Sequence, residues 1–302
     1  MNRATFITVL VLIAAFTGSV LTSNEVEAAR GQQATLEEVM YIPSGKALKR
    51  MSLGYSGVLA DIYWTRAIQY YGRRLGRHDE NVRFDLLYPL LDITTDLDPH
   101  LIVAYQFGSI FLSQSPPVGA GQPDKAVALV EKGIRANPDY WRLYFTLGCI
   151  HYFDRKDYKA AELAFRKGSE NPQAAAWMKV MAATMASRAK DAETAYYLWT
   201  QIYQSTDDKM VRENARQHLA AFRVDHDVLE LERRVTIYLQ RTGHLPSSWY
   251  DLIRERLLGS VPLDPADHPY QLMPDGSVQV QDPEGLPFIT QGVPPGWKKS
   301  TK

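Results

Sequence analysis

The residues of this chain that could perform chemistry are scattered, and their spacing favours structural roles. The seven histidines form neither an HExxH pair nor a His-x-His pair, which are arrangements that can hold zinc. The segment "DHD", residues 225–227, places one histidine between two aspartates and could suggest a metal site. Because acidic side chains cap the free N–H groups at a helix start, we interpret Asp225 or Asp227 as a helix N-cap.

Three further patterns come near to functional motifs without matching them. "GAGQPDK", residues 119–125, lacks both the spacing and the Ser/Thr of a phosphate-binding loop. "GYSG", residues 54–57, is one residue shorter than the serine nucleophile elbow GxSxG. Asp264 and Asp267 could form a carboxylate pair or a calcium site, but a proline-rich turn explains both. We therefore expect no catalytic residue, metal or cofactor, and a hydrolase is the least favoured function.

The composition is that of a folded protein without net charge. Hydrophobic residues make up 45% of the 302 residues and charged residues 23%, and 34 basic side chains balance 34 acidic ones. Since nucleic acids attract proteins through a basic excess, we do not expect nucleic-acid binding. The single cysteine, Cys149, cannot form an intramolecular disulfide, and its apolar surroundings predict a buried, unreactive thiol.

The N-terminus has the organisation of an export signal. Arg3 precedes an uncharged run of 21 residues, Ala4 to Asn24, and "VEA" before Ala29 provides a cleavage site. A helix of about 20 apolar residues can also span a bilayer, so residues 1–28 are either a cleaved signal, which we favour slightly, or a single retained anchor. Both interpretations predict that the remaining chain is exported to the periplasm or the extracytoplasmic face of the membrane.

A 34-residue offset relates two successive segments of the chain. "KDYKAAELAFRKGSENP", residues 156–172, returns in outline as "KDAETAYYLWTQI", residues 190–202. Six positions correspond at this one offset, and the size of the side chain is kept where the residue changes. The pairs are Leu147 and Met181, Gly148 and Ala182, Lys156 and Lys190, Asp157 and Asp191, Ala161 and Ala195, and Phe165 and Trp199.

This spacing is similar to that of the tetratricopeptide repeat (TPR), a 34-residue helical hairpin with small and aromatic residues at fixed steps. One residue is inserted before Asp157 relative to that pattern. A related unit begins at Ala104 and includes Gly108 and Ala126, and a degenerate unit begins at Trp64. The resemblance implies a TPR-like α-solenoid in which small residues allow close helix packing. The repeat-packing residues are Gly108, Ala126, Leu147, Gly148, Ala161, Phe165, Ala182, Ala195 and Trp199.

The predicted organisation has five parts. Residues 1–28 are the signal or anchor, 29–54 a linker or N-terminal extension, 55–206 the repeats, 207–242 a capping helical hairpin, and 243–302 a C-terminal helix, β-hairpin and tail. Proline and glycine become frequent after Gly243, where Ser247 or Ser248 can cap a short helix. "PYQLMPDGSVQV", residues 269–280, predicts a hairpin that turns at Asp275-Gly276.

The segments at Gly243, Leu245-Pro246, Asp264-Pro265 and Pro269-Tyr270 follow a similar spacing to the C-terminal region of the pseudopilins of type II secretion systems, which this part of the chain resembles. Two features differ: Ala266-Asp267 replaces their usual bulky-residue and glycine pair, and the apolar methylated pilin N-terminus is absent. The resemblance implies either a link to pilus or secretion machinery or, the interpretation we prefer, a motif that closes the end of the solenoid.

The TPR resemblance implies a concave groove that binds a peptide or a partner protein. The first helices of successive repeats would line it with Tyr105, Ser109, Leu112, Arg142, Phe145, Tyr152, Phe153 and Lys179. Core packing is the alternative for these residues, and for Tyr105, Arg142 and Tyr152 both interpretations stay open. We therefore expect an exported scaffold that binds proteins in a cell-envelope assembly; the alternative is an accessory structural subunit of a membrane complex, tethered through residues 4–24.

Overall fold

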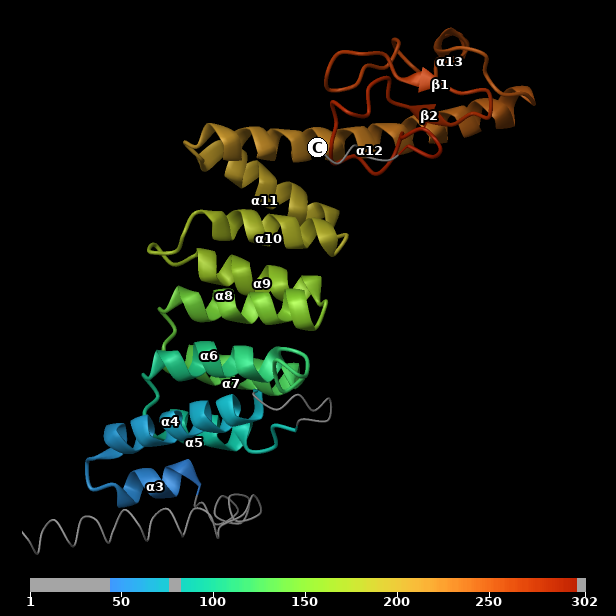
Figure 1. Cartoon of the computed structure of the whole chain (residues 1–302). Helices are drawn as coiled ribbons and strands as arrows, with labels where there is room; N and C mark the ends of the chain where they lie inside the picture. The colour runs from blue at the N-terminus through green and yellow to red at the C-terminus, as the bar shows by residue number, and fades with distance from the viewer. Residues whose placement is uncertain (1–43, 76–82, 298–302) are drawn as a thin grey trace, which may run out of the picture. The chain divides into compact units, whose positions relative to one another are not determined.

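The computed structural model describes residues 44–75 and 83–297, and every structural statement below concerns these residues. They form eleven α-helices, one π-helical turn and one two-stranded sheet, so the fold is all-α as predicted (Figure 1). The predicted signal or anchor, residues 1–28, lies outside the described residues. The chain divides into two compact units, residues 1–136 and 137–302, which are treated separately. The division falls inside the segment that was predicted as one repeat array.

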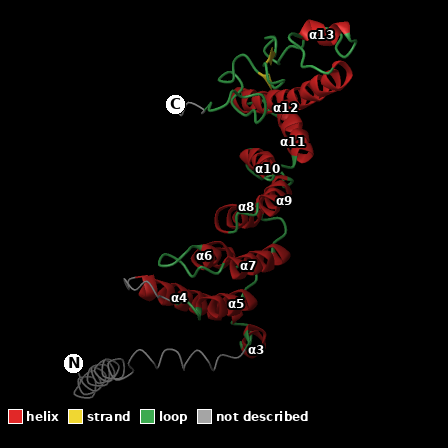
Figure 2. Cartoon of the chain, turned by 90° about the vertical axis from the view of Figure 1, so that its right-hand side faces the viewer, coloured by secondary structure: helices red, strands yellow, loops and turns green. Residues whose placement is uncertain are grey.

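The first unit consists of helices that pack with their neighbours along the chain (Figures 1 and 2). Helix α4 packs along α5, and α6 packs along α7, so each pair forms a hairpin. Helix α3 packs on α5 and lies within the segment that was predicted as a linker. The bounds are α3 Gly45–Met51, α4 Ser56–Leu75, α5 Leu87–Leu97, α6 Ile102–Ser113 and α7 Pro123–Ala136.

An ion-pair network and close backbone approaches hold this unit together. Lys132 of α7 places its Nζ atom 2.7 Å from Asp92 Oδ1 and 2.6 Å from Asp96 Oδ1, both on α5. Gly108, one of the predicted repeat-packing residues, meets α5 so closely that an added Cβ would lie 2.7 Å from Leu91. Ala126 is fully buried. The small residues of the pattern therefore lie where helices approach each other.

The second unit begins with two further hairpins. Their helices are α8 Trp141–Cys149, α9 Tyr158–Ser169, α10 Trp177–Arg188 and α11 Ala192–Ser205, and each packs on the next (Figure 1). A π-helical turn, η1 Ile150–Asp154, extends α8, with the Arg155 N–H donating to the Ile150 carbonyl.

The 34-residue offset is visible in the backbone of this unit. Lys156 and Lys190 have left-handed φ angles of 55° and 57°. Asp157 and Asp191, which follow them, are the N-caps of α9 and α11, and each carboxylate accepts a backbone N–H three residues later. Two hairpins with the same cap and the same strained residue before it show that the sequence repeat is a structural repeat.

The packing landmarks of the repeat also coincide. Ala161 and Ala195 are both fully buried, as are Phe165 and Trp199 four residues later in each helix. Gly148 and Ala182 are both buried, and Leu147 and Met181 are both half-buried. A Cβ on Gly148 would lie 2.5 Å from the Phe165 ring, so this position requires glycine for the helices to approach. The predicted packing roles in this unit agree with the observed burial.

Residues 207–242 do not form the predicted capping hairpin. They contain one helix of 34 residues, α12 Lys209–Thr242, which is capped by Asp208 and ends at Gly243 with φ 81°. Asp225 and Asp227 were interpreted as caps, but both lie in the interior of α12. Instead of capping, their carboxylates accept hydrogen bonds from residues distant in sequence: Thr290 donates to Asp225, and Tyr270 donates to Asp227.

The C-terminal segment folds against the second half of α12 (Figure 2). Helix α13, Trp249–Arg254, begins with a capping box between Ser248 and Asp251, as the serine pattern predicted. Strands β1 Gln271–Leu272 and β2 Val278–Gln279 pair antiparallel around Gly276, which has φ 86°. A core joins these elements to α12, and it includes Val228, Leu231, Val235, Trp249, Leu252, Tyr270, Val278 and Leu286.

Candidate functional site

The predicted groove residues of the first unit are core residues. Tyr105, Ser109 and Leu112 are each fully buried in α6. The ring of Tyr105 lies over Gly133 of α7, where a Cβ would come within 2.7 Å, and burial raises the pKa of its hydroxyl to about 12. These three side chains cannot contact a partner in this fold, so their assignment to a groove is corrected to helix packing.

In the second unit, the predicted residues of α8 belong to an aromatic cluster with one exposed side. Arg142 is exposed, and its guanidinium lies 4.7 Å from the centroid of the Trp141 ring. Phe145 is half-buried, 6.0 Å from the ring of Phe165 and 5.1 Å from that of Trp177 on α10. Phe145 therefore packs between helices, and Arg142 lies at the edge of the cluster.

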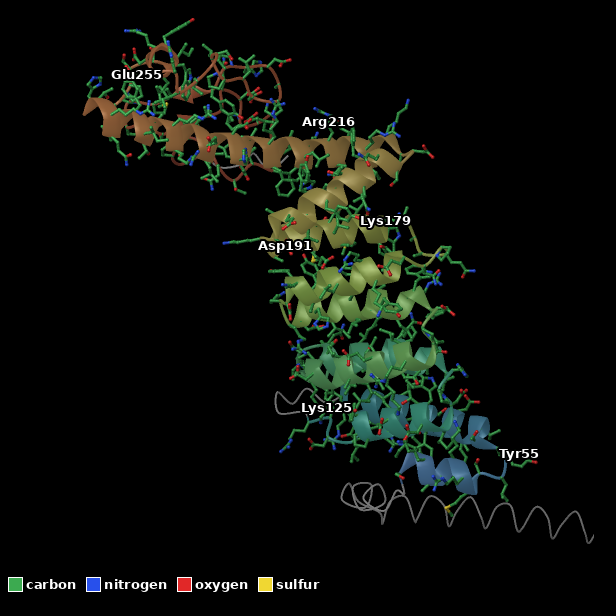
Figure 3. The ribbon with its side chains drawn as sticks, turned by 180° about the vertical axis from the view of Figure 1, so that it is seen from behind. Tyr55, Lys125, Lys179, Asp191, Arg216 and Glu255 are labelled. Atoms are coloured by element: carbon green, nitrogen blue, oxygen red, sulfur yellow. The ribbon has the colours of Figure 1, made fainter. Side chains whose placement is uncertain are left out.

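The remaining predicted residues are spread along the same hairpins. Tyr152 is half-buried, with its ring 4.4 Å from that of Phe153 and the Arg188 guanidinium 5.2 Å above it. Phe153 is exposed, as is Lys179 on α10 (Figure 3). The structure brings Tyr152 and Phe153 together, but it does not join them with Arg142 and Lys179 into one pocket.

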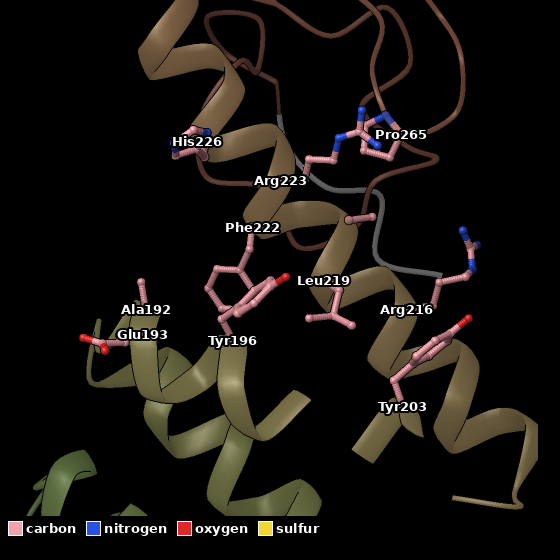
Figure 4. A pocket seen from close by; sticks show the side chains of 11 residues that line it. Ala192, Glu193, Tyr196, Tyr203, Arg216, Leu219, Phe222, Arg223, His226 and Pro265 are labelled. Atoms are coloured by element: carbon pink, nitrogen blue, oxygen red, sulfur yellow. The ribbon is translucent and has the colours of Figure 1, made fainter. Parts of the chain in front are cut away.

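A concave site does occur in this unit, between α11 and α12, and we call it the α11–α12 groove (Figure 4). It has a volume of about 810 Å³. Tyr196 of α11 meets Phe222 of α12 edge to face, with ring centroids 6.2 Å apart and an interplanar angle of 82°. The other lining residues are Ala192, Glu193, Tyr203, Arg216, Leu219, Ala220, Arg223, His226 and Pro265.

Helical spacing explains why these side chains share one face. On α11, Ala195, Leu198, Trp199 and Ile202 are buried, which leaves Tyr196 and Tyr203, seven residues apart, 54% and 41% exposed. On α12 the spacing of three and four residues aligns Arg216, Leu219 and Arg223 along the groove. Two amphipathic helices thus present a partly apolar surface that their own packing does not cover.

The charged groups of the α11–α12 groove are held in defined positions. Arg216 forms an ion pair with Glu213 at 2.7 Å, and Arg223 lies 3.6 Å from Asp227. The hydrogen bond from Arg216 holds the pKa of the Glu213 carboxyl below its usual range. The charged residues of the lining itself are Arg216, Arg223 and Glu193, and the carboxylates that pair with the two arginines lie outside it.

Residues that could have supplied chemistry are committed to structure. Burial raises the pKa of the Cys149 thiol to about 11, which keeps the sulfur protonated and a weak nucleophile near neutral pH. The buried carboxylate of Asp264 accepts the backbone N–H groups of Ala266 and His268, so it builds the turn. Asp267 follows in this turn with φ 64°. Among residues 44–75 and 83–297, no three His, Cys, Asp or Glu side chains are grouped to hold a metal ion.

Within the described ranges, no helix combines the length and the apolar character that crossing a bilayer requires. The apolar run at residues 4–24 lies outside these ranges.

No known family model matches this sequence. No curated protein and no solved structure matches it either. The fold itself defines an all-α protein of consecutive helical hairpins, to which a small C-terminal β-hairpin is attached.

Sequence inspection did not find the α11–α12 groove. The signal was present in α11, since "AYYLWTQIY" carries three exposed tyrosines, of which those at positions 196 and 203 share one side, next to the buried face. The predicted first helix of residues 207–242 already placed Leu219 and Phe222 on one face, but that face was not paired with the exposed tyrosines of α11.

Proposed function

We propose that this protein is an exported scaffold of the TPR-like α-solenoid type, which binds a protein partner in a cell-envelope assembly. The observation that carries this proposal is the α11–α12 groove, whose aromatic and arginine lining is typical of surfaces that dominate binding energy. The 34-residue structural repeat and the sequence of an export signal support the class and the location.

The lining favours one kind of occupant, a peptide segment with apolar side chains flanked by acidic residues. Tyr196, Phe222 and Leu219 offer apolar contact area, and tyrosine contributes this area at a low cost in side-chain entropy. Arg216 and Arg223 at the same surface complement carboxylates, which arginine binds through paired hydrogen bonds. Nothing in the groove resembles a catalytic arrangement, so binding is the function that its chemistry supports.

The alternative is an accessory structural subunit of a membrane complex, tethered through residues 4–24. For the scaffold proposed above, the pseudopilin-like C-terminal sequence favours secretion or pilus machinery as the envelope assembly. Membrane association that survives an alkaline wash would support the tethered subunit over a soluble adaptor.

Peptide selection on the whole protein tests the groove. A random peptide library would be panned, and the enriched peptides would be labelled and titrated by fluorescence anisotropy. We expect apolar peptides with acidic flanks, and a loss of affinity of about tenfold or more in Tyr196→Ala, as for a typical aromatic anchor.

Tyr197→Ala is the matched control, because Tyr197 is 58% exposed on the same helix but does not line the groove. Equal effects of the two substitutions, or enrichment of peptides without acidic residues, would contradict the proposed occupant. A photo-crosslinker at position 196, compared with position 197, then tests whether the natural partner contacts the same surface in cells.

A further inference from the structure

Large apolar side chains are exposed at the beginning of the first unit, far in sequence from the α11–α12 groove. They occupy the end of α3, the following turn and the first two turns of α4, and Figure 3 shows Tyr55 among them. We call this surface the α3–α4 apolar edge. Its members and their exposed fractions are Met51 71%, Leu53 88%, Tyr55 71%, Val58 57% and Ile62 43%.

Helix geometry shows that the exposed apolar residues of α4 do not belong to the face that packs in the hairpin. Helix α4 buries Ala60, Tyr63 and Ala67 in its packing with α5. Val58 and Ile62, four residues apart, lie on the opposite face, where a soluble helix normally carries polar side chains. The helix is therefore apolar on both faces over its first two turns, and only one of them has a partner within the unit.

The turn between α3 and α4 exposes its leucine through the backbone. Leu53 has φ 48° and Gly54 has φ 94°, so two consecutive residues adopt the left-handed conformation. A leucine is disfavoured there because of its Cβ and its bulk. Its side chain is nevertheless the most exposed of the large apolar residues in the described part of the chain.

Basic side chains accompany the α3–α4 apolar edge in the sequence. Lys46, Lys49 and Arg50 are exposed on α3. Between residues 44 and 75 the sequence has six basic residues and a single acidic one, Asp61, whereas the chain as a whole is neutral. The first described segment thus combines a local positive charge with exposed apolar groups.

We propose that the α3–α4 apolar edge binds the surface of a bilayer that contains anionic lipids. Apolar side chains enter the boundary between headgroups and acyl chains, while lysine and arginine contact the anionic headgroups. A protein partner would fit this composition less well, because lysine is depleted in protein–protein interfaces. This surface is distinct from the tether of residues 4–24 and independent of the α11–α12 groove.

Depth-dependent fluorescence on the full-length protein tests this inference. An environment-sensitive dye would be attached to Leu53→Cys in a Cys149→Ala background and mixed with vesicles of neutral phosphatidylcholine or of a phosphatidylcholine–phosphatidylglycerol mixture. We expect a blue shift and quenching by lipid-borne quenchers on the anionic vesicles. A dye at Phe107→Cys, an exposed position of α6 in the same unit, should not respond.

Charge reversal separates this contact from insertion of residues 4–24, which remain unchanged. Lys46→Glu/Lys49→Glu/Arg50→Glu should weaken the response at position 53 by about tenfold or more, since each basic residue near an anionic surface contributes about 1 kcal/mol. Arg135→Glu/Lys159→Glu/Lys167→Glu, at exposed positions elsewhere, makes the same change in charge and should have little effect. A dye at position 53 that stays in water on both kinds of vesicle overturns the proposal. A dye that leaves water only when envelope proteins are added also overturns the proposal, because the surface would then bind a protein.

Discussion

Thr290 is bound to Asp225, which precedes it by 65 residues, through both its backbone N–H and its hydroxyl group, at 2.8 and 2.7 Å. The neighbouring Gln291 N–H donates to the same carboxylate at 2.8 Å. One acidic side chain in the middle of α12 therefore fixes the last described segment of the chain. Glu232, two turns further along the helix, accepts the Val278 N–H at 3.1 Å and fixes β2 in the same way.

Replacement of Asp225 by alanine should release this segment. We expect a loss of about 1–3 kcal/mol in the free energy of unfolding, because hydrogen bonds to a charged acceptor are lost. Limited proteolysis near residue 290 should become faster, and mass spectrometry of the fragments would locate the cut. Asp207→Ala, at an exposed position just before α12, is the control. Cleavage rates that are equal in the two variants would contradict the anchoring role.

Gly148→Ala should destabilise the second unit. The added Cβ would lie 2.5 Å from the Phe165 ring, and overpacking a core costs about 1–3 kcal/mol. Replacing a helical glycine by alanine stabilises the helix by about 0.5–1 kcal/mol through the backbone entropy, so the steric cost is the larger effect. Urea unfolding measures the difference. Gly259→Ala, which adds a Cβ in open space, should leave the midpoint unchanged. A Gly148→Ala midpoint at or above that of the native protein would contradict the close approach.

The two repeated caps should respond alike to substitution. Asp157→Ala removes the acceptor of the Ala160 N–H, and loss of such a cap costs about 1 kcal/mol. Asp191→Ala, at the equivalent position, should destabilise in the same direction. Thermal unfolding of both variants checks this, with Asp157→Asn and Asp191→Asn as controls, since asparagine caps helices as well as aspartate. A clear effect at only one site would show that the hairpins are not energetically equivalent.

Acid should weaken the cap of α13. Hydrogen bonding from Ser247 holds the pKa of Asp251 below its usual range. The unfolded state therefore binds a proton more readily than the folded state does. The stability that the ionised Asp251 contributes is fully present above the ordinary aspartate pKa, about 3.9, and is lost as the pH falls through the lower pKa of the folded state. Denaturant midpoints at pH 7 and pH 3 should differ less in Asp251→Asn than in the native protein. An unchanged difference would contradict this assignment.

Local patterns were enough to predict much of the fold. The 34-residue offset predicted that Asp157 and Asp191 occupy equivalent positions. The serines before Trp249 predicted the start of α13, Gly243 predicted the end of α12, and Asp275-Gly276 predicted the hairpin turn. These features succeed because each depends on residues within a few positions of one another. They do not depend on the rest of the chain.

Interactions between distant segments account for the failures. Asp225 and Asp227 have the composition of a helix cap, but both lie inside the continuous α12, where they bind Thr290 and Tyr270. Tyr105 fits a groove position of the repeat, yet its ring packs in the core, in the space that Gly133 leaves because it has no side chain. The α11–α12 groove was missed because its two walls come from different helices, and local patterns do not show which faces of two helices meet.

Helix α12 takes part in two cores: its first half packs on α11 through Ala215, and its second half forms the C-terminal core through Val228 and Leu231. A force applied to the C-terminal core would therefore act on the same helix that forms one wall of the α11–α12 groove. Because α12 is one continuous helix of 34 residues, no loop separates the groove wall from the C-terminal core.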